Sequence, residues 1–272
     1  MEPRPARYTR SVLRRRHLVE LEDLPWFPAV LRDGGTAYLE LAVRASGHGK
    51  LLVPKFAEAL KQTGSTEIVD LCSGGGGPMR IIDEELAARG TPVKVTLTDY
   101  YPNVQAFAHV SAGSNGRIRG EPASIDATAV PAQLTGFRTV FNAFHHFRPP
   151  QARQILADAA QAGRPIAVFE VVSRELFTLF ALLTVPIGVT LTVPFWRPFR
   201  WSWLLWTWVV PVLPLFVLWD GLVSWLRIYS EAELRELVAD IDAPGYTWDI
   251  GLIPLGGAPA HATYLIGRPR AD

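Results

Sequence analysis

Residues 67–77, EIVDLCSGGGG, decide the fold of this chain. The apolar run at 67–72 predicts a buried strand, and the glycines that follow Ser73 predict a tight turn. A helix is expected at 78–89. A helix that begins at such a turn directs free backbone N–H groups and the positive end of its dipole toward a ligand, and glycines let the ligand approach the backbone closely. The stretch therefore predicts a nucleotide or cofactor site on an α/β domain.

The alternation of strands and helices continues on the C-terminal side of this turn. Strand-like apolar runs separated by helical patterns predict parallel βαβ units and a doubly wound sheet. The last two runs are joined by a short link rich in Gly and Pro, which predicts an antiparallel C-terminal edge on a mostly parallel, seven-stranded sheet. The expected strands are 67–72, 93–99, a shorter third strand that ends with 123–127, 137–144, 165–172, 246–254 and 262–267. The expected helices among them are 78–89, 150–162 and one that follows Ser230, with Glu233 at the capping-box position.

Residues 1–62 lack a strand pattern and predict a helical cap. The glycine pair at 34–35 is expected to break the chain before a short helix at 36–45, and another helix is expected at 51–62. Six arginines lie among the first twenty residues, without the apolar core of a signal peptide. We interpret them either as a solvated tail or as a contact with anionic lipid headgroups.

The composition excludes several classes of protein. The chain has 272 residues, of which 49% are hydrophobic, so it can bury a large core. Its net charge of +1 argues against a general nucleic-acid-binding protein, because such proteins neutralise phosphates with a basic face. Cys72 is the one cysteine, which excludes an internal disulfide and a zinc site built from cysteines, and favours a reducing, cytoplasmic setting.

Three features narrow the ligand of the glycine turn. Asp70 lies inside the strand, four residues before Gly74. The dinucleotide pattern G-x-G-x-x-G fails, because Met79 stands at its third glycine. Asp99 ends the next strand, where a carboxylate can accept hydrogen bonds from both hydroxyls of a ribose. In these residues the chain resembles the class I S-adenosylmethionine-dependent methyltransferases.

The resemblance covers residues 66–172 and 228–269 and implies S-adenosylmethionine as the cofactor. It implies that Asp99 binds the ribose and that Asp126 contacts the adenine amino group. Cys72 departs from the family pattern, because it stands where the family usually has its first glycine. The cofactor-binding residues that the resemblance implies are Asp70, Cys72, Ser73, Gly74, Gly76, Asp99, Tyr100, Asp126, Ala127 and Asn142.

Candidate catalytic residues follow the fourth and fifth strands, where ligands bind in open α/β sheets. His145 and His146 follow the fourth strand, and either is a candidate general base, although paired histidines in this family often only shape the site. Glu170 lies in the apolar run of the fifth strand and needs a partner, either in catalysis or in a structural ion pair. No spacing of side chains in the sequence predicts a metal site.

Residues 175–227 do not fit a plain α/β domain. Residues 176–195 and 203–219 carry no charged side chain, and seven of the nine tryptophans lie in this stretch. A helix of about twenty residues spans the hydrocarbon core of a bilayer, so we expect membrane contact through a spanning or a shallow, re-entrant hairpin. A spanning hairpin would carry two arginines across the membrane, against the positive-inside tendency. A soluble lid or dimer interface is the alternative.

These features predict three parts: an N-terminal helical cap at 1–62, a methyltransferase domain at 63–174 and 228–272, and a hydrophobic insert at 175–227, with a membrane contact through 176–225. The expected function is methyl transfer from S-adenosylmethionine to a lipophilic small-molecule acceptor on the cytoplasmic side of a membrane. One alternative is a non-catalytic membrane- or partner-binding protein that keeps the methyltransferase fold. The other is a soluble methyltransferase whose insert forms an oligomer interface. No nucleic-acid partner is expected.

Overall fold

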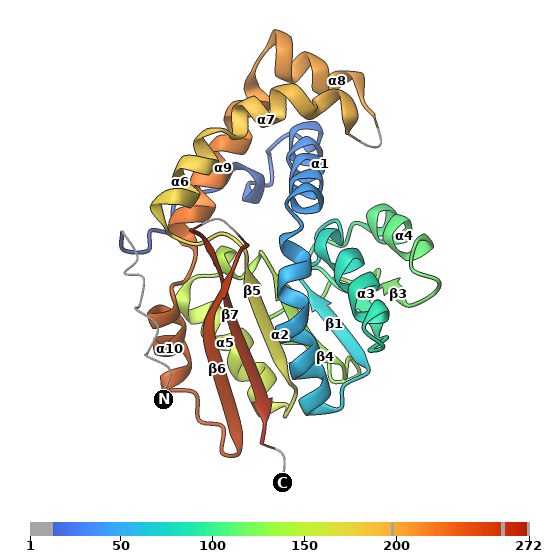
Figure 1. The fold of residues 1–272 in the computed structure, drawn as a ribbon, viewed down its shortest axis with the longest axis vertical. Coiled ribbons are helices and arrows are strands. Elements are labelled where there is room, and N and C mark those ends of the chain that lie inside the picture. Colours follow the sequence, from blue (N-terminus) through green and yellow to red (C-terminus); the bar gives the residue numbers. More distant parts are fainter. Residues whose placement is uncertain (1–12, 197–198, 257–258, 271–272) are drawn as a thin grey trace.

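The computed structural model describes residues 13–196, 199–256 and 259–270. Helices cover both faces of a sheet, and a lobe of further helices stands above one end of the strands (Figure 1). In the described residues the sheet has seven strands in the order β3-β2-β1-β4-β5-β7-β6. These strands are β1 (Glu67–Leu71), β2 (Lys94–Leu97), β3 (Ile118–Gly120), β4 (Phe137–Phe141), β5 (Ile166–Glu170), β6 (Tyr246–Pro254) and β7 (His261–Pro269).

Neighbouring strands from β3 to β5 pair in parallel, and β7 pairs antiparallel with both β5 and β6. Every residue of β4 and β5 is buried, as expected of strands that are covered on both faces. The structure thus confirms the predicted mostly parallel, seven-stranded sheet with its antiparallel C-terminal edge. The residues that follow β1, β2, β4 and β5 all lie at one end of the sheet, which we call the carboxyl edge.

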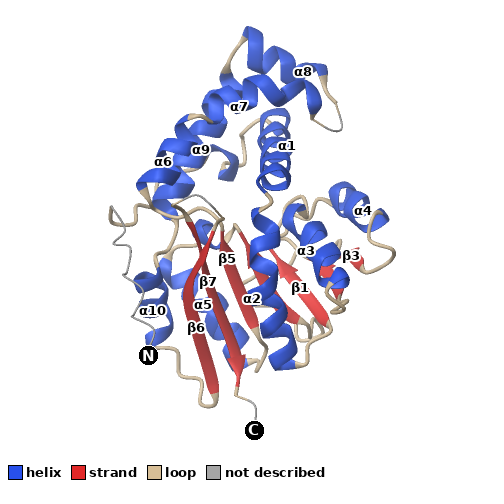
Figure 2. Cartoon of the chain, viewed as in Figure 1, coloured by secondary structure: helices blue, strands red, loops and turns tan. Residues whose placement is uncertain are grey.

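Helices pack on the two faces of the sheet around separate apolar cores (Figure 2). On one face, Phe56 packs edge-on against Phe137 and Phe169. On the other face, Ile155 and Leu234 belong to the core. The first face is covered by α2 (His48–Thr63), α3 (Gly77–Ala88) and α4 (Val104–Ala112), and the second by α5 (Pro149–Gln161) and α10 (Glu231–Ala239), which begins with the predicted capping box of Ser230 and Glu233.

The third strand lies earlier in the sequence than predicted. Residues 123–127, predicted to end it, form a loop and a turn instead. Glu121 N–H still donates to the Leu97 carbonyl oxygen of β2 (2.9 Å), but the Ala123 N–H, next in the ladder, donates to the Glu121 side chain (3.1 Å), so regular pairing with β2 ends there. Farther along, the Ile125 N–H donates to the Asp99 carbonyl oxygen (2.9 Å) and ties the loop to the end of β2.

Helix α1 (Ala29–Ser46) is longer than predicted, and the expected break at residues 34–35 is wrong. The two glycines lie where α1 packs against a helix of the lobe, α9 (Val212–Arg227). A Cβ atom on Gly34 would lie 2.9 Å from Leu213 Cδ1, and one on Gly35 would lie 2.8 Å from the ring of Phe216. The glycines therefore serve a close approach between two helices, and the helix continues through them.

The insert lobe, formed by the described residues of 175–227, stands above the carboxyl edge (Figure 1). Its helices share a core with the N-terminal part of the chain, in which Phe27 and Leu31 pack with Trp196 and Trp203. The elements of the lobe are α6 (Leu176–Leu183), α7 (Val185–Thr192), a 3-10 turn (Val193–Phe195), α8 (Trp201–Leu204), a π-helical turn (Leu205–Val209) and α9. The N-terminal helix α1 is thus a packing partner of the lobe as well as a cover for the sheet end.

Candidate active site

The glycine turn after β1 has left-handed backbone angles at alternating positions. Cys72, Gly74 and Gly76 have φ values of 56°, 52° and 76°. Glycine adopts this conformation freely, whereas a residue with a Cβ loses about 1–2 kcal/mol. Cys72 therefore adopts the conformation for which the family pattern uses glycine, and the turn keeps its shape despite the departure. A Cβ built on Gly74 would meet nothing within 4 Å, so space for a ligand remains in front of the turn.

Asp99 braces this turn from the end of β2. Its Oδ2 accepts a hydrogen bond from the Gly74 N–H (2.8 Å), and its Oδ1 accepts one from the Tyr101 N–H (2.9 Å). Each carboxylate oxygen has a second lone pair, which stays available to a ligand hydroxyl. The Tyr100 ring lies beside this carboxylate in the sequence and is 53% exposed. The structure thus places Asp99 directly over the glycine turn.

Asp70 lies beneath the turn and is buried. Its carboxylate accepts hydrogen bonds from the hydroxyl groups of Thr139 (2.6 Å) and Ser73 (2.7 Å). Burial raises the pKa of Asp70 to about 7, although the two hydroxyl groups act in the opposite direction. In this arrangement Asp70 and Ser73 hold the turn against β4, which is a positioning role.

The loop that carries Asp126 and Ala127 contributes to the apolar core against which Cys72 packs. Asp126 Oδ1 accepts hydrogen bonds from the N–H (2.8 Å) and the hydroxyl group (2.7 Å) of Thr128, while Ala127 is buried. Burial raises the pKa of the Cys72 thiol, and the charges of Asp99, Asp70 and Asp126 raise it further. The charges of all three predicted acids therefore act on Cys72.

Asn142 joins the ends of β4 and β5. Its φ is 51°, its N–H donates to the Phe169 carbonyl oxygen (2.9 Å), and its Oδ1 accepts from the Val171 N–H (2.8 Å). Asparagine tolerates this left-handed conformation better than most residues with a side chain. The bend turns the chain after β4 so that His145 comes to lie beside Glu170.

His145 and Glu170 form a buried pair with two contacts. Glu170 Oε1 accepts from the His145 backbone N–H (3.0 Å), and Oε2 lies 2.9 Å from His145 Nδ1. Since a carboxylate accepts hydrogen bonds, Nδ1 carries a proton in this pair, so in the neutral ring Nε2 has the lone pair. The fold therefore fixes both the orientation and the tautomer of the His145 ring.

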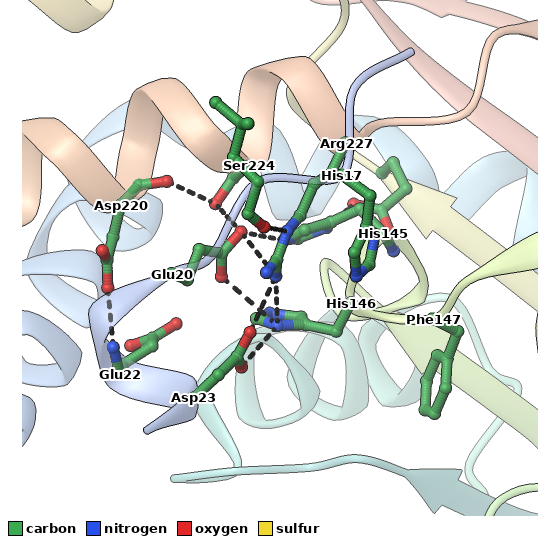
Figure 3. A network of polar contacts seen from close by, with 12 residues as sticks. His17, Glu20, Glu22, Asp23, His145, His146, Phe147, Asp220, Ser224 and Arg227 are labelled. Carbon is green, nitrogen blue, oxygen red and sulfur yellow. Dashed lines mark hydrogen bonds and ion pairs between the residues drawn. The ribbon is translucent and has the colours of Figure 1, made fainter. Parts of the chain in front are cut away.

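His146 points toward the N-terminal segment (Figure 3). Its Nδ1 lies 3.1 Å from Asp23 Oδ1 and 3.3 Å from Glu20 Oε2. Burial lowers the pKa of His146, but the hydrogen bond with Asp23 and the charges of Glu20, Asp23 and Glu22 outweigh burial and raise the pKa to about 9. At neutral pH the ring is therefore a cation in this arrangement, with no lone pair to accept a proton as a general base.

The structure adds Glu20, Asp23 and Arg227 to the predicted site residues (Figure 3). Glu20 is completely buried, its Oε1 accepts from the Ser224 hydroxyl group (3.0 Å), and the same oxygen pairs with Arg227 (3.1 Å). Arg227 also pairs with Asp23 (2.8 Å). Glu20 and His145 are far apart in the sequence, and no motif connects them. Sequence reasoning therefore missed these acids and the arginine.

The N-terminal segment that carries Glu20 is fastened to α9 by hydrogen bonds. The N–H groups of Leu21 and Glu22 donate to the Asp220 carboxylate (2.7 and 3.0 Å). Arg227 Nε donates to the Leu18 carbonyl oxygen (2.8 Å). The segment therefore covers the histidine pair on the side away from β5, and the lobe holds it in place.

Other parts of the carboxyl edge complete the site. A Cβ built on Gly75 would lie 3.4 Å from Thr36 Cγ2, so α1 reaches over the glycine turn. By contrast, a hollow of about 520 Å³ lies at the opposite end of the strands, lined among others by Glu67, Gly136 and Arg164. The predicted cofactor residues and the histidine pair do not line it. The chemistry-bearing side chains thus gather at the carboxyl edge, beneath α1 and the lobe.

Comparison with solved structures identifies the fold. A structure of the plantazolicin methyltransferase BpumL in complex with SAH has a TM-score of 0.55 and 9% sequence identity, and the match covers 92% of this chain and 94% of that one. The methyltransferase SibL in its apo form has a TM-score of 0.52 and 18% identity, covering 92% of this chain and 61% of that chain. Human N-acetylserotonin methyltransferase in complex with SAM has a TM-score of 0.51 and 15% identity, and the match covers 95% of this chain and 63% of that chain.

This chain therefore has the class I S-adenosylmethionine-dependent methyltransferase fold, as the glycine turn and the acid after β2 predicted. It spans about three fifths of the length of the last two proteins. No protein-family model matches the sequence, and no curated protein matches it at a significant level. At identities below 20% the likeness concerns the fold, and the reaction has to be argued from the site.

Proposed function

We propose that this protein transfers a methyl group from S-adenosylmethionine to a lipophilic small-molecule acceptor at a membrane surface. The observation that carries the proposal is the glycine turn at the carboxyl edge, braced by Asp99, in a class I methyltransferase fold. Two of the compared structures contain SAM or SAH, which supports this choice of cofactor.

The residues of the turn fit this cofactor. The open space in front of Gly74 admits the methionine part close to the backbone. Asp99 has lone pairs free for the ribose hydroxyls, and the loop with Asp126 lies on the adenine side. Cys72, between these acids, stays a neutral thiol because its pKa is raised by burial. The bound cofactor supplies a methyl group on a positively charged sulfur.

The chain's own residues orient the acceptor and exclude water, and positioning of this kind supplies much of the rate in a direct displacement. His145 follows β4 at the carboxyl edge, and the hydrogen bond from its Nδ1 to Glu170 leaves Nε2 as the proton acceptor. His146 is cationic and holds the N-terminal segment through Asp23 and Glu20. We therefore place His145 and Glu170 in the reaction and His146 in the support of the site.

The exposed apolar face of the lobe favours a lipophilic acceptor. The segment Leu176–Phe195 is 20 residues long with a mean hydropathy of 2.2, and only 11% of its most apolar window is buried. By length and composition it is able to cross a membrane. Its inner face packs on α1 and α9 around Val189 and Val193, so we favour a position in one leaflet of the bilayer.

The exposed tryptophans of the lobe suit the boundary between lipid and water. Trp208 is 54% exposed and Trp219 46%. Their indole N–H groups donate to the carbonyl oxygens of Thr190 (3.0 Å) and Val19 (3.1 Å), so the rings can enter an apolar phase without leaving a donor unpaired. The lobe stands directly above the carboxyl edge, where it would pass an acceptor from the membrane to the donor.

The first test is calorimetry with S-adenosylmethionine on the wild type and on Asp99→Ala. We expect the substitution to weaken binding by about 1.5–3 kcal/mol, because it removes charge-assisted hydrogen bonds to the ribose as well as the brace on Gly74. Unchanged affinity would overturn the cofactor assignment. Glu236→Ala, at an exposed position of α10, is a control that should leave binding unchanged.

Turnover is the second test. We expect purified protein to transfer a labelled methyl group to a component of a membrane lipid extract, and His145→Ala to reduce the rate strongly. A protein that binds S-adenosylmethionine but methylates nothing in such extracts would favour a non-catalytic role on this fold.

A further inference from the structure

We propose that Glu20, His145 and His146 form a binding site for a divalent transition-metal cation at the acceptor side of the active site. The inference rests on the geometry of these residues and deepens the proposed function, because the cation would hold the acceptor. One ligand atom from each residue lies within 4.8 Å of the other two. Two imidazoles and one carboxylate are the donor set of zinc and non-haem iron sites.

The distances suit a cation with only small movements. His146 Nδ1 lies 3.3 Å from Glu20 Oε2, and His145 Nε2 lies 3.9 Å from Glu20 Oε1. Ligands about 2.1 Å from a tetrahedral zinc ion are about 3.4 Å from one another. The separation between His146 Nδ1 and Glu20 Oε2 already matches, and the other ligand atoms, which lie within 4.8 Å of one another, need to approach by about 1.4 Å or less.

Glu20 has a buried carboxylate oxygen, Oε2, whose described polar contact is the ion pair with His146 Nδ1 (3.3 Å). Its Oε1 is engaged by Ser224 and Arg227, but its Oε2 is buried and makes no hydrogen bond. A buried carboxylate oxygen without a hydrogen bond is costly, so such an atom calls for an explanation. Oε2 is the atom that faces His146, and a bound cation would satisfy it (Figure 3).

The second support for the site is the way in which His145 is held. In metal sites, the ring nitrogen of a ligating histidine that does not bind the metal usually donates to a carboxylate or a carbonyl oxygen, which fixes the tautomer. His145 Nδ1 has this partner in Glu170 (2.9 Å), which leaves Nε2 on the side of Glu20. The pair is therefore built as a histidine ligand and its orienting carboxylate.

The charges around the cluster also favour a divalent cation. The carboxylates of Glu20, Asp23, Glu170 and Asp220 gather here, and the nearby guanidinium groups are those of Arg15 and Arg227. These four carboxylates carry two more charges than the two guanidinium groups neutralise, and Glu22 is not included among them. A divalent cation bound to neutral imidazoles would offset both charges.

Arg227 borders the site, with its Nη1 3.5 Å from His146 Nδ1 and 3.1 Å from Glu20 Oε1. Its guanidinium group pairs with Glu20 Oε1 and Asp23 Oδ2, and Nε is fixed on the Leu18 carbonyl oxygen. The Oε2 atom of Glu20 is left to the cation. Three protein ligands would leave a fourth position open, as in catalytic metal sites, where the cation would hold and polarise an acceptor oxygen. His145 Nε2 would then be a metal ligand, with its Nδ1–H still held by Glu170.

The experiment is a titration of the full-length, untagged and chelator-treated protein with Co²⁺, followed by visible absorption and by calorimetry. We expect one Co²⁺ per chain with the intense absorption of a four-coordinate site, and displacement by Zn²⁺. Glu20→Gln keeps the shape of the side chain and removes its charge, and we expect it to weaken binding at least tenfold. Glu170→Gln should weaken binding by 10- to 100-fold, the usual effect of removing the carboxylate that orients a ligand.

His261→Asn is the matched control, because His261 and Glu175 form another histidine–carboxylate pair (2.9 Å) apart from this cluster. It should bind Co²⁺ like the wild type. A wild type that takes up no Co²⁺, or a Glu20→Gln variant with wild-type affinity, would overturn the proposal, and the wild-type result decides even if a variant fails to fold. S-adenosylmethionine binding is measured in the same samples. A protein that binds the cofactor but no Co²⁺ loses this inference and keeps the proposed function.

Discussion

Asp70 is a carboxyl group that the fold removes from water. It lies in β1, and its only described hydrogen-bond donors are the hydroxyl groups of Thr139 and Ser73. Two neutral donors do not offset the loss of hydration, so the pKa rises from the ordinary value of 3.8 to about 7. Asp70, which the family resemblance places at the cofactor, thus also has a role in the fold. Its hydrogen bonds join β1, β4 and the glycine turn.

This shift predicts a pH dependence of stability. Between about pH 4 and pH 7 the folded protein keeps the proton of Asp70 while the unfolded chain has released it, so the stability contribution of this group falls as the pH rises. Asp70→Asn has no such proton. We expect the free energy of unfolding of the wild type, measured with urea, to fall across this window by up to about 1.4 kcal/mol per pH unit relative to that of Asp70→Asn. Parallel pH profiles for the two proteins would contradict the assignment.

The contact between α1 and α9 shows how two small residues set the position of an element. Leu213 and Phe216 of α9 are buried against Gly34 and Gly35, where side chains would overlap. The N-terminal helix therefore approaches the lobe more closely than larger residues would allow. This approach also brings Thr36 over the glycine turn, so the packing of one helix pair affects the access to the donor site.

Gly35→Ala tests this contact. In an exposed helix the change would stabilise the protein by about 1 kcal/mol, but here the Cβ would lie 2.8 Å from the Phe216 ring. Overpacking typically costs about 1–3 kcal/mol, so we expect a net loss of stability in thermal unfolding. Ala45→Gly, at an exposed position of the same helix, measures the effect of helix propensity alone. It should lower the free energy of unfolding by no more than about 1 kcal/mol. A Gly35→Ala protein more stable than the wild type would refute close packing here.

The elements that sequence reasoning predicted well are those with strong local patterns. The apolar runs of β1, β4 and β5, the glycine turn and the Ser230 capping box each follow from residues within one element. The position of β3 was wrong because the Ala123 N–H donates to the Glu121 side chain instead of continuing the ladder with β2. The break expected in α1 was wrong because the deciding contact, with the Phe216 ring, comes from a distant part of the chain. Glu20 was missed for the same reason, since its partners His146 and Arg227 come from distant parts of the chain.

At the scale of the molecule, polar and apolar surfaces are separated. Most of the large apolar side chains that are well exposed belong to the insert lobe, among them Phe180, Leu191, Phe195 and Trp201. Exposed apolar patches of this kind mark interaction sites. The position of the lobe above the carboxyl edge puts this surface and the active site at the same end of the molecule (Figure 1).

Vesicle binding tests the membrane contact. Ile187 and Leu191 lie one turn apart on α7 and are 62% and 67% exposed. We expect the wild type to sediment with phosphatidylcholine vesicles and the double variant Ile187→Glu, Leu191→Glu to bind them at least tenfold less, because charged side chains resist transfer into lipid. Val104→Glu on α4, 54% exposed in the wild type, should bind like the wild type. A wild-type protein that stays in the supernatant and forms a dimer would favour the oligomer interface.

The hydrogen bond between Leu18 and Arg227 can form only late in the synthesis of the chain. Its partners are 209 residues apart. At a synthesis rate of about 5–20 residues per second, Arg227 leaves the ribosome roughly 10–40 seconds after Leu18. During this time the segment with Glu20 has no α9 to dock on, although its residues emerge early. Glu20, which completes the histidine cluster, is thus among the first residues to be synthesised and among the last to contact its partners. A stalled or shortened nascent chain would therefore carry a formed glycine turn but an unassembled acceptor side.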